Sequence, residues 1–301
     1  MSAHRTIRLA TRASRLALAQ TQIVADALHA MDGIGVEIVP LSTRADRDTR
    51  PLQEVGARGM FAVELEQALR EGIVDAAVHS CKDLALVDTA GLRVAAWLER
   101  EDARDAICGP ATIADIPKGA RISTSSARRT AALQHLDPTW TAVPIRGNVE
   151  TRLRVSAERG DDGCMLAEAG LRRLGLSVPR VVLDIEQVVP EPAQGVIVVQ
   201  TRIEDSEDPV WAALHHAPTQ WCANLERTIA RLLDGGCETP VGVHVTRESS
   251  VAHVHWFIAR PGAAPVTGMH EISAALTVQE ALEQLLPQLP LDAPLAEGSQ
   301  R

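Results

Sequence analysis

Cys237 is a candidate reactive thiol. It lies in the segment Leu-Asp-Gly-Gly-Cys-Glu-Thr-Pro at residues 233–240. A predicted helix runs into this segment, and two glycines before the cysteine permit positive φ angles, so the backbone can turn and hold the thiol outward. A thiol presented in this way can be reached by a large partner. Taken alone, however, the pattern fits a buried cysteine beside a helix end better, since free cysteines are mostly small buried apolar residues.

Arginines stand where three predicted helices begin, each directly after a predicted strand. A cation at a helix N-terminus is disfavoured by the helix dipole unless an anion also lies there, held by free N–H groups, hydroxyls and guanidinium groups. One such turn could be an accident of the surface. Three at strand ends predict a ligand with several carboxylates or phosphates, and no phosphate loop of the Gly-x-x-x-x-Gly-Lys-Ser/Thr type is present. The arginines concerned are Arg12, Arg128, Arg129, Arg146 and Arg152.

Asp83 follows another predicted strand and is flanked by Lys82. A carboxylate at this edge can accept N–H groups, stabilise a cation and pass a proton to a departing amine. It can equally be the capping residue of the helix that follows. The spacing alone leaves both interpretations open.

The composition excludes several classes of protein. The chain has 301 residues, 46% of them hydrophobic, and a formal net charge of −9, which argues against a general nucleic-acid or anionic-membrane surface. Lys82 and Lys118 are its only lysines. No apolar run has transmembrane length, and the N-terminus lacks the apolar core of a signal peptide. The five scattered cysteines indicate a reducing compartment, and so we expect the cytosol.

Hydrophobic periodicity predicts strands and helices in alternation, which is typical of a largely parallel α/β sheet. A second α/β unit begins near residue 102, and the strand at 196–201 could return to the first sheet. From residue 218 the pattern changes to a helix, three strands and a helix, which predicts a small α+β domain. We therefore expect domain 1 at 1–98 with 196–216, domain 2 at 99–195 and domain 3 at 217–301. The predicted strands are 6–10, 36–41, 74–79, 120–123, 141–145, 196–201, 241–246, 251–259 and 266–272, and the helices are 16–30, 61–71, 127–136, 149–158, 218–233 and 277–286.

The ordered set of these motifs resembles the hydroxymethylbilane synthase family, also called porphobilinogen deaminase. Any one segment is weak, but together they come in the family's order and span residues 8 to about 242. The matching segments are 8–14, 42–46, 56–61, 75–83, 99–105, 123–129, 146–153, 169–175, 192–195 and 233–237.

The resemblance implies a transferase of tetrapyrrole (porphyrin and haem) biosynthesis. It would join four porphobilinogen molecules into hydroxymethylbilane, with loss of ammonia at each step. The growing chain would hang on a dipyrromethane cofactor that is thioether-linked to Cys237. The implied fold has two α/β domains like those of periplasmic binding proteins, an active cleft between them, and a small α+β domain. We expect a cytoplasmic monomer that needs no metal.

The resemblance also assigns roles to residues. Asp83 matches the catalytic aspartate, and the segment 46–58, with Asp46 and Arg58, would be a lid. The cofactor-binding residues, besides Cys237, would be Ser80, Lys82, Asp83, Thr124, Ser126, Arg128, Arg129, Arg146 and Gly147. The substrate-binding residues would be Arg12, Ser14, Phe61, Arg146, Arg152, Arg173 and Gln194.

Several positions depart from the family pattern. Glu150 adds a negative charge near Arg146 and Arg152, and Arg58 replaces a usual lysine in the lid. Two alternatives to an active enzyme follow: a cytosolic protein that binds small anions on the same scaffold, and a poorly active paralogue. An intact Cys237 argues against the first. The remaining departures are Cys81, Ser123 and Ala193.

Overall fold

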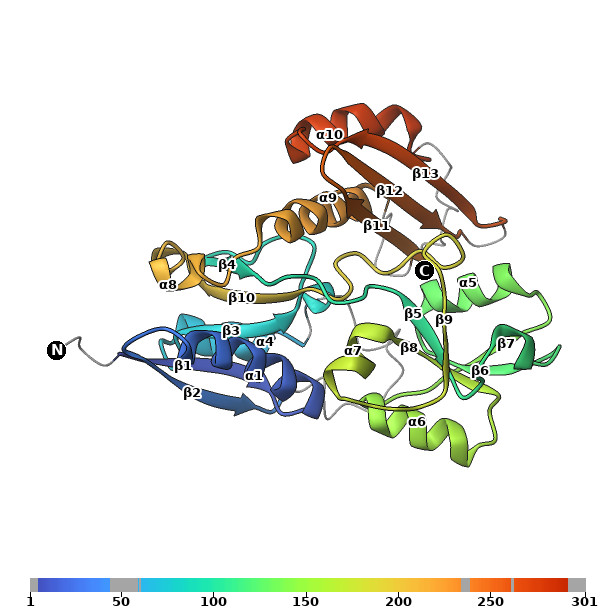
Figure 1. Cartoon of the computed structure of the whole chain (residues 1–301), viewed down its shortest axis with the longest axis horizontal. Helices are drawn as coiled ribbons and strands as arrows, with labels where there is room; N and C mark the ends of the chain where they lie inside the picture. Colours follow the sequence, from blue (N-terminus) through green and yellow to red (C-terminus); the bar gives the residue numbers. More distant parts are fainter. Residues whose placement is uncertain (1–4, 44–58, 60, 234–238, 261–262, 292–301) are drawn as a thin grey trace, which may run out of the picture.

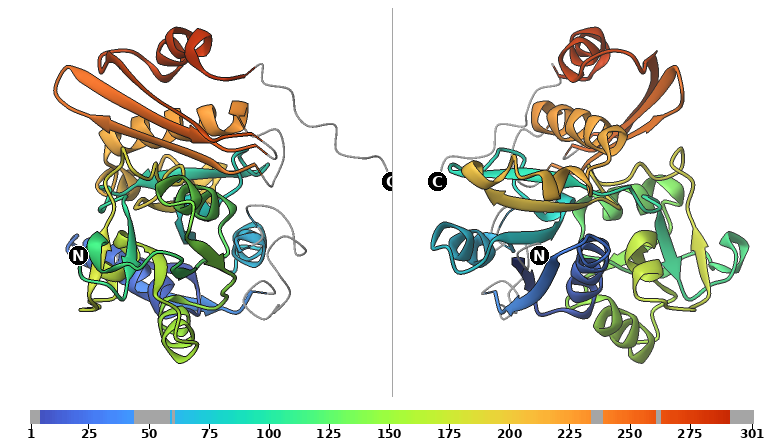
Figure 2. Two further views of the ribbon diagram at one scale, coloured as in Figure 1. Left: turned by 90° about the vertical axis from the view of Figure 1, so that its right-hand side faces the viewer. Right: turned by 60° about the vertical axis from the view of Figure 1, so that its left-hand side comes forward.

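The computed structural model describes residues 5–43, 59, 61–233, 239–260 and 263–291. Asp46, Arg58 and Cys237 lie outside the described residues. The described chain forms two sheets of five strands and one of three, with the smallest sheet above the other two in Figure 1 and seen from two further sides in Figure 2. Within these ranges, no helix has the length and apolar character needed to cross a bilayer.

The first sheet combines N-terminal strands with one strand from far along the chain. Its elements are β1 (Arg5–Arg12), α1 (Arg15–His29), β2 (Ile34–Leu41), α4 (Val63–Arg70), β3 (Ala76–Ser80), the 3-10 turn η1 (Cys81–Asp83), β4 (Leu92–Trp97), β10 (Ile197–Arg202), η3 (Ile203–Asp205) and α8 (Pro209–Ala212). The strand order is β2-β1-β3-β10-β4. The predicted return of the β10 segment to this sheet is confirmed by its pairing with β3 and β4.

The second sheet has the order β7-β6-β8-β5-β9. Its elements are β5 (Asp105–Cys108), η2 (Ile113–Asp115), β6 (Arg121–Ser123), α5 (Ala127–Leu136), β7 (Thr141–Val143), α6 (Val149–Glu158), β8 (Gly163–Ala167), α7 (Glu168–Arg173) and β9 (Arg180–Val182). β6 runs parallel to β7 and β8, whereas β5 runs antiparallel to β8 and β9.

The prediction of largely parallel sheets is confirmed, with one reversed strand in each large sheet. β10 is antiparallel to both of its neighbours in the first sheet, as β5 is in the second. Each of these strands follows a segment that links the two sheets, residues 98–104 before β5 and residues 183–196 before β10. The chain therefore enters each sheet from the other one, against the direction set by the local strand-helix-strand units.

Side-chain caps explain why three helices begin where the arginine-bearing turns were predicted. Ser14 accepts the Ala17 N–H at the start of α1 at 3.3 Å. Ser126 does the same for α5, and Asn148 does so for α6. Because a capping oxygen satisfies one of the free N–H groups of the first turn, it fixes the residue at which each helix begins.

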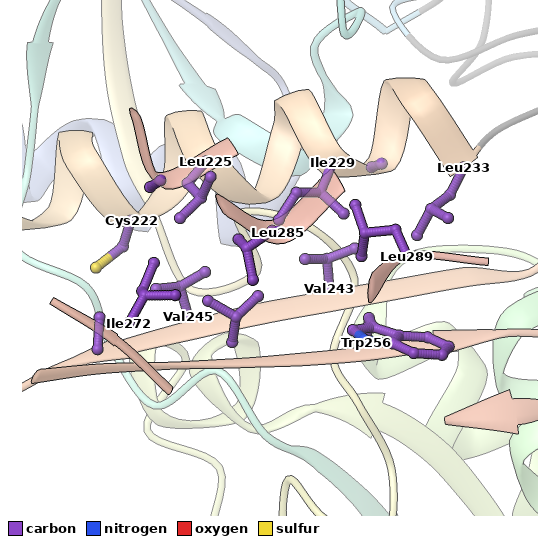
Figure 3. Close-up of a cluster of buried hydrophobic side chains, with 14 of the residues drawn as sticks. Cys222, Leu225, Ile229, Leu233, Val243, Val245, Trp256, Ile272, Leu285 and Leu289 are labelled. Atoms are coloured by element: carbon purple, nitrogen blue, oxygen red, sulfur yellow. The ribbon is translucent and has the colours of Figure 1, made fainter. Parts of the chain in front are cut away.

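The third unit confirms the predicted α+β organisation at the C-terminal end. Its elements are α9 (Ala217–Leu233), β11 (Val241–Arg247), β12 (Val251–Ile258), β13 (Val266–Ser273), α10 (Val278–Leu285) and η4 (Leu286–Gln288). The three strands form an antiparallel meander. Figure 3 shows Leu225, Ile229 and Leu233 of α9 facing Val243 and Val245 of β11 across one buried core.

Glu226 of α9 ties this third unit to both segments that link the two large sheets. Its buried carboxylate accepts Arg100 Nη1 at 2.6 Å and Nη2 at 2.9 Å, on the first link. It also accepts the backbone N–H of Ala193, on the second link, at 2.7 Å, and that of Val245 at 2.7 Å. One carboxylate thus fixes the junction of all three units. Moving the units apart would remove its donors and leave a buried negative charge unpaired, which would strongly destabilise the protein.

Candidate active site

A cavity of about 690 Å³ lies between the first and second sheets. One wall comes from the ends of β1 and β3, the other from the starts of α6 and α7, and residues 194–196 of the second link also line it. This volume is in the range of small-molecule sites, about 300–1,000 Å³. Its described lining holds six cationic side chains and one carboxylate. These are Arg12, Lys82, Arg129, Arg146, Arg152 and Arg173 together with Asp83.

Asp83 faces the cavity from the short η1 turn that follows β3. Arg12 Nη1 lies 3.9 Å from Asp83 Oδ2, and the Arg12 guanidinium stacks over the Phe61 ring at 4.1 Å. Burial raises the pKa of the Asp83 carboxyl, although Lys82 and Arg12 act in the opposite direction. An acid of this kind can hold a negative charge in a cationic cleft and exchange its proton closer to neutral pH.

Lys82 is connected to the second sheet through Gln194. The Lys82 ammonium donates to Gln194 Oε1 at 3.0 Å. Gln194 Nε2 in turn donates to Asp105 Oδ1 at 2.9 Å and to the Ala103 carbonyl at 2.7 Å. Since Gln194 is almost completely buried, these three bonds fix its amide and with it the position of the Lys82 head group.

Asp105 is a functional neighbour that the sequence did not reveal, because the run 101–105 reads as a salt-linked domain boundary. Asp102 fits that reading, since it pairs with Arg104 at 2.7 Å. Asp105 instead points inward, where its carboxylate pairs with Arg128 Nη2 at 2.8 Å and with Arg129 Nη2 at 2.7 Å. The two guanidinium groups hold the pKa of Asp105 far below its usual range, against the opposing effect of burial.

Arg146, Gly147 and Arg152 surround the start of α6. Arg152 Nε donates to the Gly147 carbonyl at 2.7 Å. Gly147 has φ +112°, and a Cβ there would lie 2.6 Å from Thr151 Cγ2, so the turn requires glycine. Arg146 Nη1 is shielded from solvent and has no hydrogen-bond partner among the described residues. A buried guanidinium N–H without an acceptor is costly, and an anionic ligand would relieve that cost.

Arg173 completes the cationic lining from α7. Its Nη2 donates to the Gly195 carbonyl at 2.6 Å. Burial lowers the pKa of Arg173 to about 10, which marks a charge with little access to water.

Most of the predicted site residues in the described chain come together in this cleft. Thr124 and Ser126 do not line it, and neither does Arg128, which is 4% exposed and donates to the Val189 carbonyl at 2.9 Å. Gln20 was missed by sequence reasoning, and its amide donates to Ser80 Oγ at 2.8 Å. The predicted residues that line the cleft are Arg12, Ser14, Phe61, Ser80, Lys82, Asp83, Arg129, Arg146, Gly147, Arg152, Arg173 and Gln194.

Glu150 makes an ion pair that spans the cleft. Its Oε1 lies 2.8 Å from Arg15 Nη1, so the starts of α6 and α1 are linked by opposite charges. A Cβ on Gly170 would lie 3.4 Å from Leu16 and 3.9 Å from Val149, which shows how closely the same two helix starts approach α7. The charge of Glu150 is therefore directed toward the first sheet.

Residues 7–208 match the family model described as "Porphobilinogen deaminase, dipyromethane cofactor binding domain". Among solved structures, the chain is similar to the methionine-binding protein MetQ, at 13% identity and a TM-score of 0.45, over 75% of this chain and 93% of that one. It is also similar to a periplasmic substrate-binding protein of an ABC transporter from Coxiella burnetii, at 15% identity and a TM-score of 0.42, over 74% of this chain and 95% of that one. A TRAP periplasmic solute binding protein from Ralstonia eutropha is similar at 13% identity and a TM-score of 0.39, over 75% of this chain and 79% of that one.

Proposed function

The chain belongs to the porphobilinogen deaminase family, and from this premise we propose that it is an active hydroxymethylbilane synthase. It joins four porphobilinogen molecules head to tail and releases ammonia at each step. The observation that carries the proposal is the lining of the cleft by described residues, six cations around one carboxylate. Porphobilinogen bears an acetate and a propionate, so each added unit brings two carboxylates that need such partners.

The donor set of the cleft fits a dipyrromethane group, which carries several carboxylates and two pyrrole N–H groups. Guanidinium and ammonium groups suit the carboxylates, Asp83 can accept the N–H groups, and the unpartnered Arg146 Nη1 suits an added anion. When bound through a thioether to Cys237, this group supplies the pyrrole carbon to which the first substrate is joined. The residues proposed to hold it are Ser80, Lys82, Asp83, Arg129, Arg146 and Gly147, with Thr124, Ser126 and Arg128 beside them.

Asp83 is proposed to act where the substrate loses its amine. As the C–N bond breaks, the electron pair leaves with nitrogen as ammonia and a cation remains on the pyrrole. The Asp83 carboxylate stabilises that cation and accepts the pyrrole N–H. The free ring carbon of the terminal pyrrole then attacks the cationic methylene carbon, a carbon–carbon bond forms, and the attacking ring carbon gives up its proton. The raised pKa of Asp83 suits it to move protons in this sequence.

The remaining cations are proposed to orient the incoming substrate. The Arg12 guanidinium stacks on the Phe61 ring. Arg152 donates to the Gly147 carbonyl and Arg173 to the Gly195 carbonyl. These contacts fix the three guanidinium groups before a ligand binds. Ser14 adds a hydroxyl at the start of α1. Holding the substrate carboxylates in one geometry favours the reaction by reducing the entropy lost on approach.

Covalent loading gives the first test. We expect the denatured wild-type protein to exceed its sequence mass by two linked pyrrole units, and we expect Cys237→Ser to lack the excess. Where neither protein carries excess mass, incubation with porphobilinogen separates two cases: an unloaded enzyme gains the mass, whereas a protein that only binds small anions does not.

Turnover gives the second test, with Asp83→Asn as the critical variant. This change keeps the size of the side chain and removes the charge that offsets the cation, so we expect a loss of about 10²–10³-fold in turnover with normal folding. Wild-type protein that carries the cofactor but forms no hydroxymethylbilane would instead identify a poorly active paralogue. Near-normal activity in Asp83→Asn would remove that residue from its role.

We also propose that the protein works as a monomer in the cytosol. The four described cysteines, Cys81, Cys108, Cys164 and Cys222, are free and buried, which suits a reducing compartment. Sedimentation of the loaded protein would test the monomer, and a dimer at assay concentrations would contradict it.

A further inference from the structure

Glu191 brings a second carboxylate to the Lys82 side of the cleft. Its Oε2 lies 3.7 Å from Lys82 Nζ, and the two side chains are 29% and 23% exposed. On another side, the same ammonium donates to Gln194 Oε1 at 3.0 Å. Lys82 is therefore held between an amide and an acid that both belong to the second link.

The backbone that carries Glu191 is rigid. Pro190 and Pro192 flank the residue, and each ring fixes its own φ and restricts the residue before it. The Glu191 carbonyl accepts the Gln194 N–H at 2.9 Å, and the Ala193 N–H is bound by the buried Glu226 carboxylate. Because the chain here has little freedom to lose, the Glu191 carboxylate stays near Lys82 at small entropic cost.

We propose that Glu191 is a positioning residue that holds the Lys82 ammonium and competes with ligand carboxylates for it. The inference rests on the proposed function, in which Lys82 binds a carboxylate of the cofactor. Without ligand, Glu191 compensates a cation that has lost much of its hydration. A ligand carboxylate that reaches Lys82 meets the negative charge of Glu191, and so its affinity is lower than the cations alone would give.

The lysine content of the chain allows a direct measurement. Lys82 and Lys118 are the only lysines, and Lys118 is exposed in a different unit, so protein labelled with ¹³C at the lysine ε carbon gives one signal from the site and one internal control. Burial lowers the pKa of Lys82, and Glu191 raises it. We expect the titration midpoint of Lys82 to fall in Glu191→Gln and to recover in Glu191→Asp, with Lys118 unchanged.

Glu186→Gln is the matched control, because Glu186 is an exposed acid on the same link and the charge change is identical. It should leave both lysine midpoints at their wild-type values. Equal Lys82 midpoints in wild type and Glu191→Gln would overturn the proposal, and so would a shift of the same size in Glu186→Gln.

Competition is tested by loading. Protein expressed without porphobilinogen is incubated with increasing porphobilinogen, and the loaded fraction is read from the intact mass. We expect Glu191→Gln to reach half-loading at about a three- to tenfold lower concentration than wild type or Glu186→Gln. An unchanged concentration would overturn the competition. Wild type that never loads would overturn the proposed function, while the Lys82 midpoints would still decide whether Glu191 holds the ammonium.

Discussion

Asp105→Asn is the change that tests how the cationic side of the cleft is held together. The Asp105 side chain is completely buried and accepts Arg129 Nε at 3.1 Å, Arg129 Nη2 at 2.7 Å and Gln194 Nε2 at 2.9 Å. It also pairs with Arg128 Nη2 at 2.8 Å. Arg128 and Arg129 are only 4% and 6% exposed, so neither can turn to water when its acid is removed.

The expected cost follows from this burial. Removing one partner of a buried ion pair destabilises a protein by about 3–5 kcal/mol, because the other charge is left uncompensated. Asparagine keeps one acceptor oxygen but presents an NH₂ group to guanidinium donors, so we expect the upper part of that range. The free energy of unfolding near pH 7, from urea denaturation of wild type and variant, measures this difference.

Asp161→Asn is the matched control for this prediction. The Asp161 side chain is also completely buried and accepts the Ser123 hydroxyl at 2.7 Å, but its cationic partner Arg121 is 54% exposed and can be hydrated when the charge is lost. We expect a cost of about 1 kcal/mol there. A cost below about 1 kcal/mol for both variants would refute the reasoning, because it would mean that Asp105 compensates no buried charge.

The pH dependence has a definite sign. The pKa of Asp105 is depressed in the folded protein, whereas an unfolded aspartate titrates near about 3.9. The stabilisation is therefore fully present above that value and is lost as the pH falls below it. The difference in unfolding free energy between wild type and Asp105→Asn should shrink when the measurement is repeated below pH 4.

Three further predictions concern stability. Burial lowers the pKa of His79 to about 4, so the folded protein keeps this imidazole neutral. The wild-type protein should therefore lose stability as the pH falls from about 6.5 to 4. His79→Gln should flatten this dependence of the unfolding free energy on pH, as measured by urea denaturation. Gly195 has φ +85°, and a Cβ there would clash with the Glu101 carbonyl. Gly195→Ala should therefore lower the unfolding free energy by about 2–4 kcal/mol, and a smaller loss would contradict the clash. Glu150→Gln removes the ion pair with the exposed Arg15 and should cost less than about 1 kcal/mol, a difference that high salt abolishes in the same assay.

Local signals were sufficient for much of the fold. Helix α6 begins and ends at the residues predicted for it, because Asn148 caps its first turn and the apolar spacing is regular. The three strands of the last unit also agree with their predictions within one residue, since the alternation at Val241, Val243 and Val245 directly reflects one buried face. In each case the stabilising partners lie within a few residues or on an adjacent strand.

The antiparallel directions of β10 and β5 could not be predicted in the same way. Their partners lie far along the chain, since Val94 pairs with Gln200 and Ala106 with Leu166. Such pairings depend on the links between the two sheets, and no periodicity within six residues encodes them. The mixed topology is therefore a tertiary property.

The location of the site could be predicted from the sequence, but many of its side-chain contacts could not. Strand-end arginines were expected to meet, and most of them do, because strands and helix starts bring them to facing edges. Arg128 and Arg129 are adjacent on α5, where successive side chains point about 100° apart. Only Arg129 lines the cleft, yet both bind Asp105, and the sequence does not indicate that inward-pointing acid.

The six cations of the described cleft lining fall into two groups according to their partners. Arg12, Lys82 and Arg129 each lie beside an acid, at Asp83, Glu191 and Asp105.

Arg152 and Arg173 donate instead to backbone carbonyls, and no carboxylate of the described chain pairs with them or with Arg146. A carbonyl fixes a guanidinium without cancelling its charge, so positive charge stays available at the start of α6 and at the end of α7. In the proposed reaction, the cations held by carbonyls bind ligand carboxylates, while Asp83 offsets the transient positive charge on the substrate.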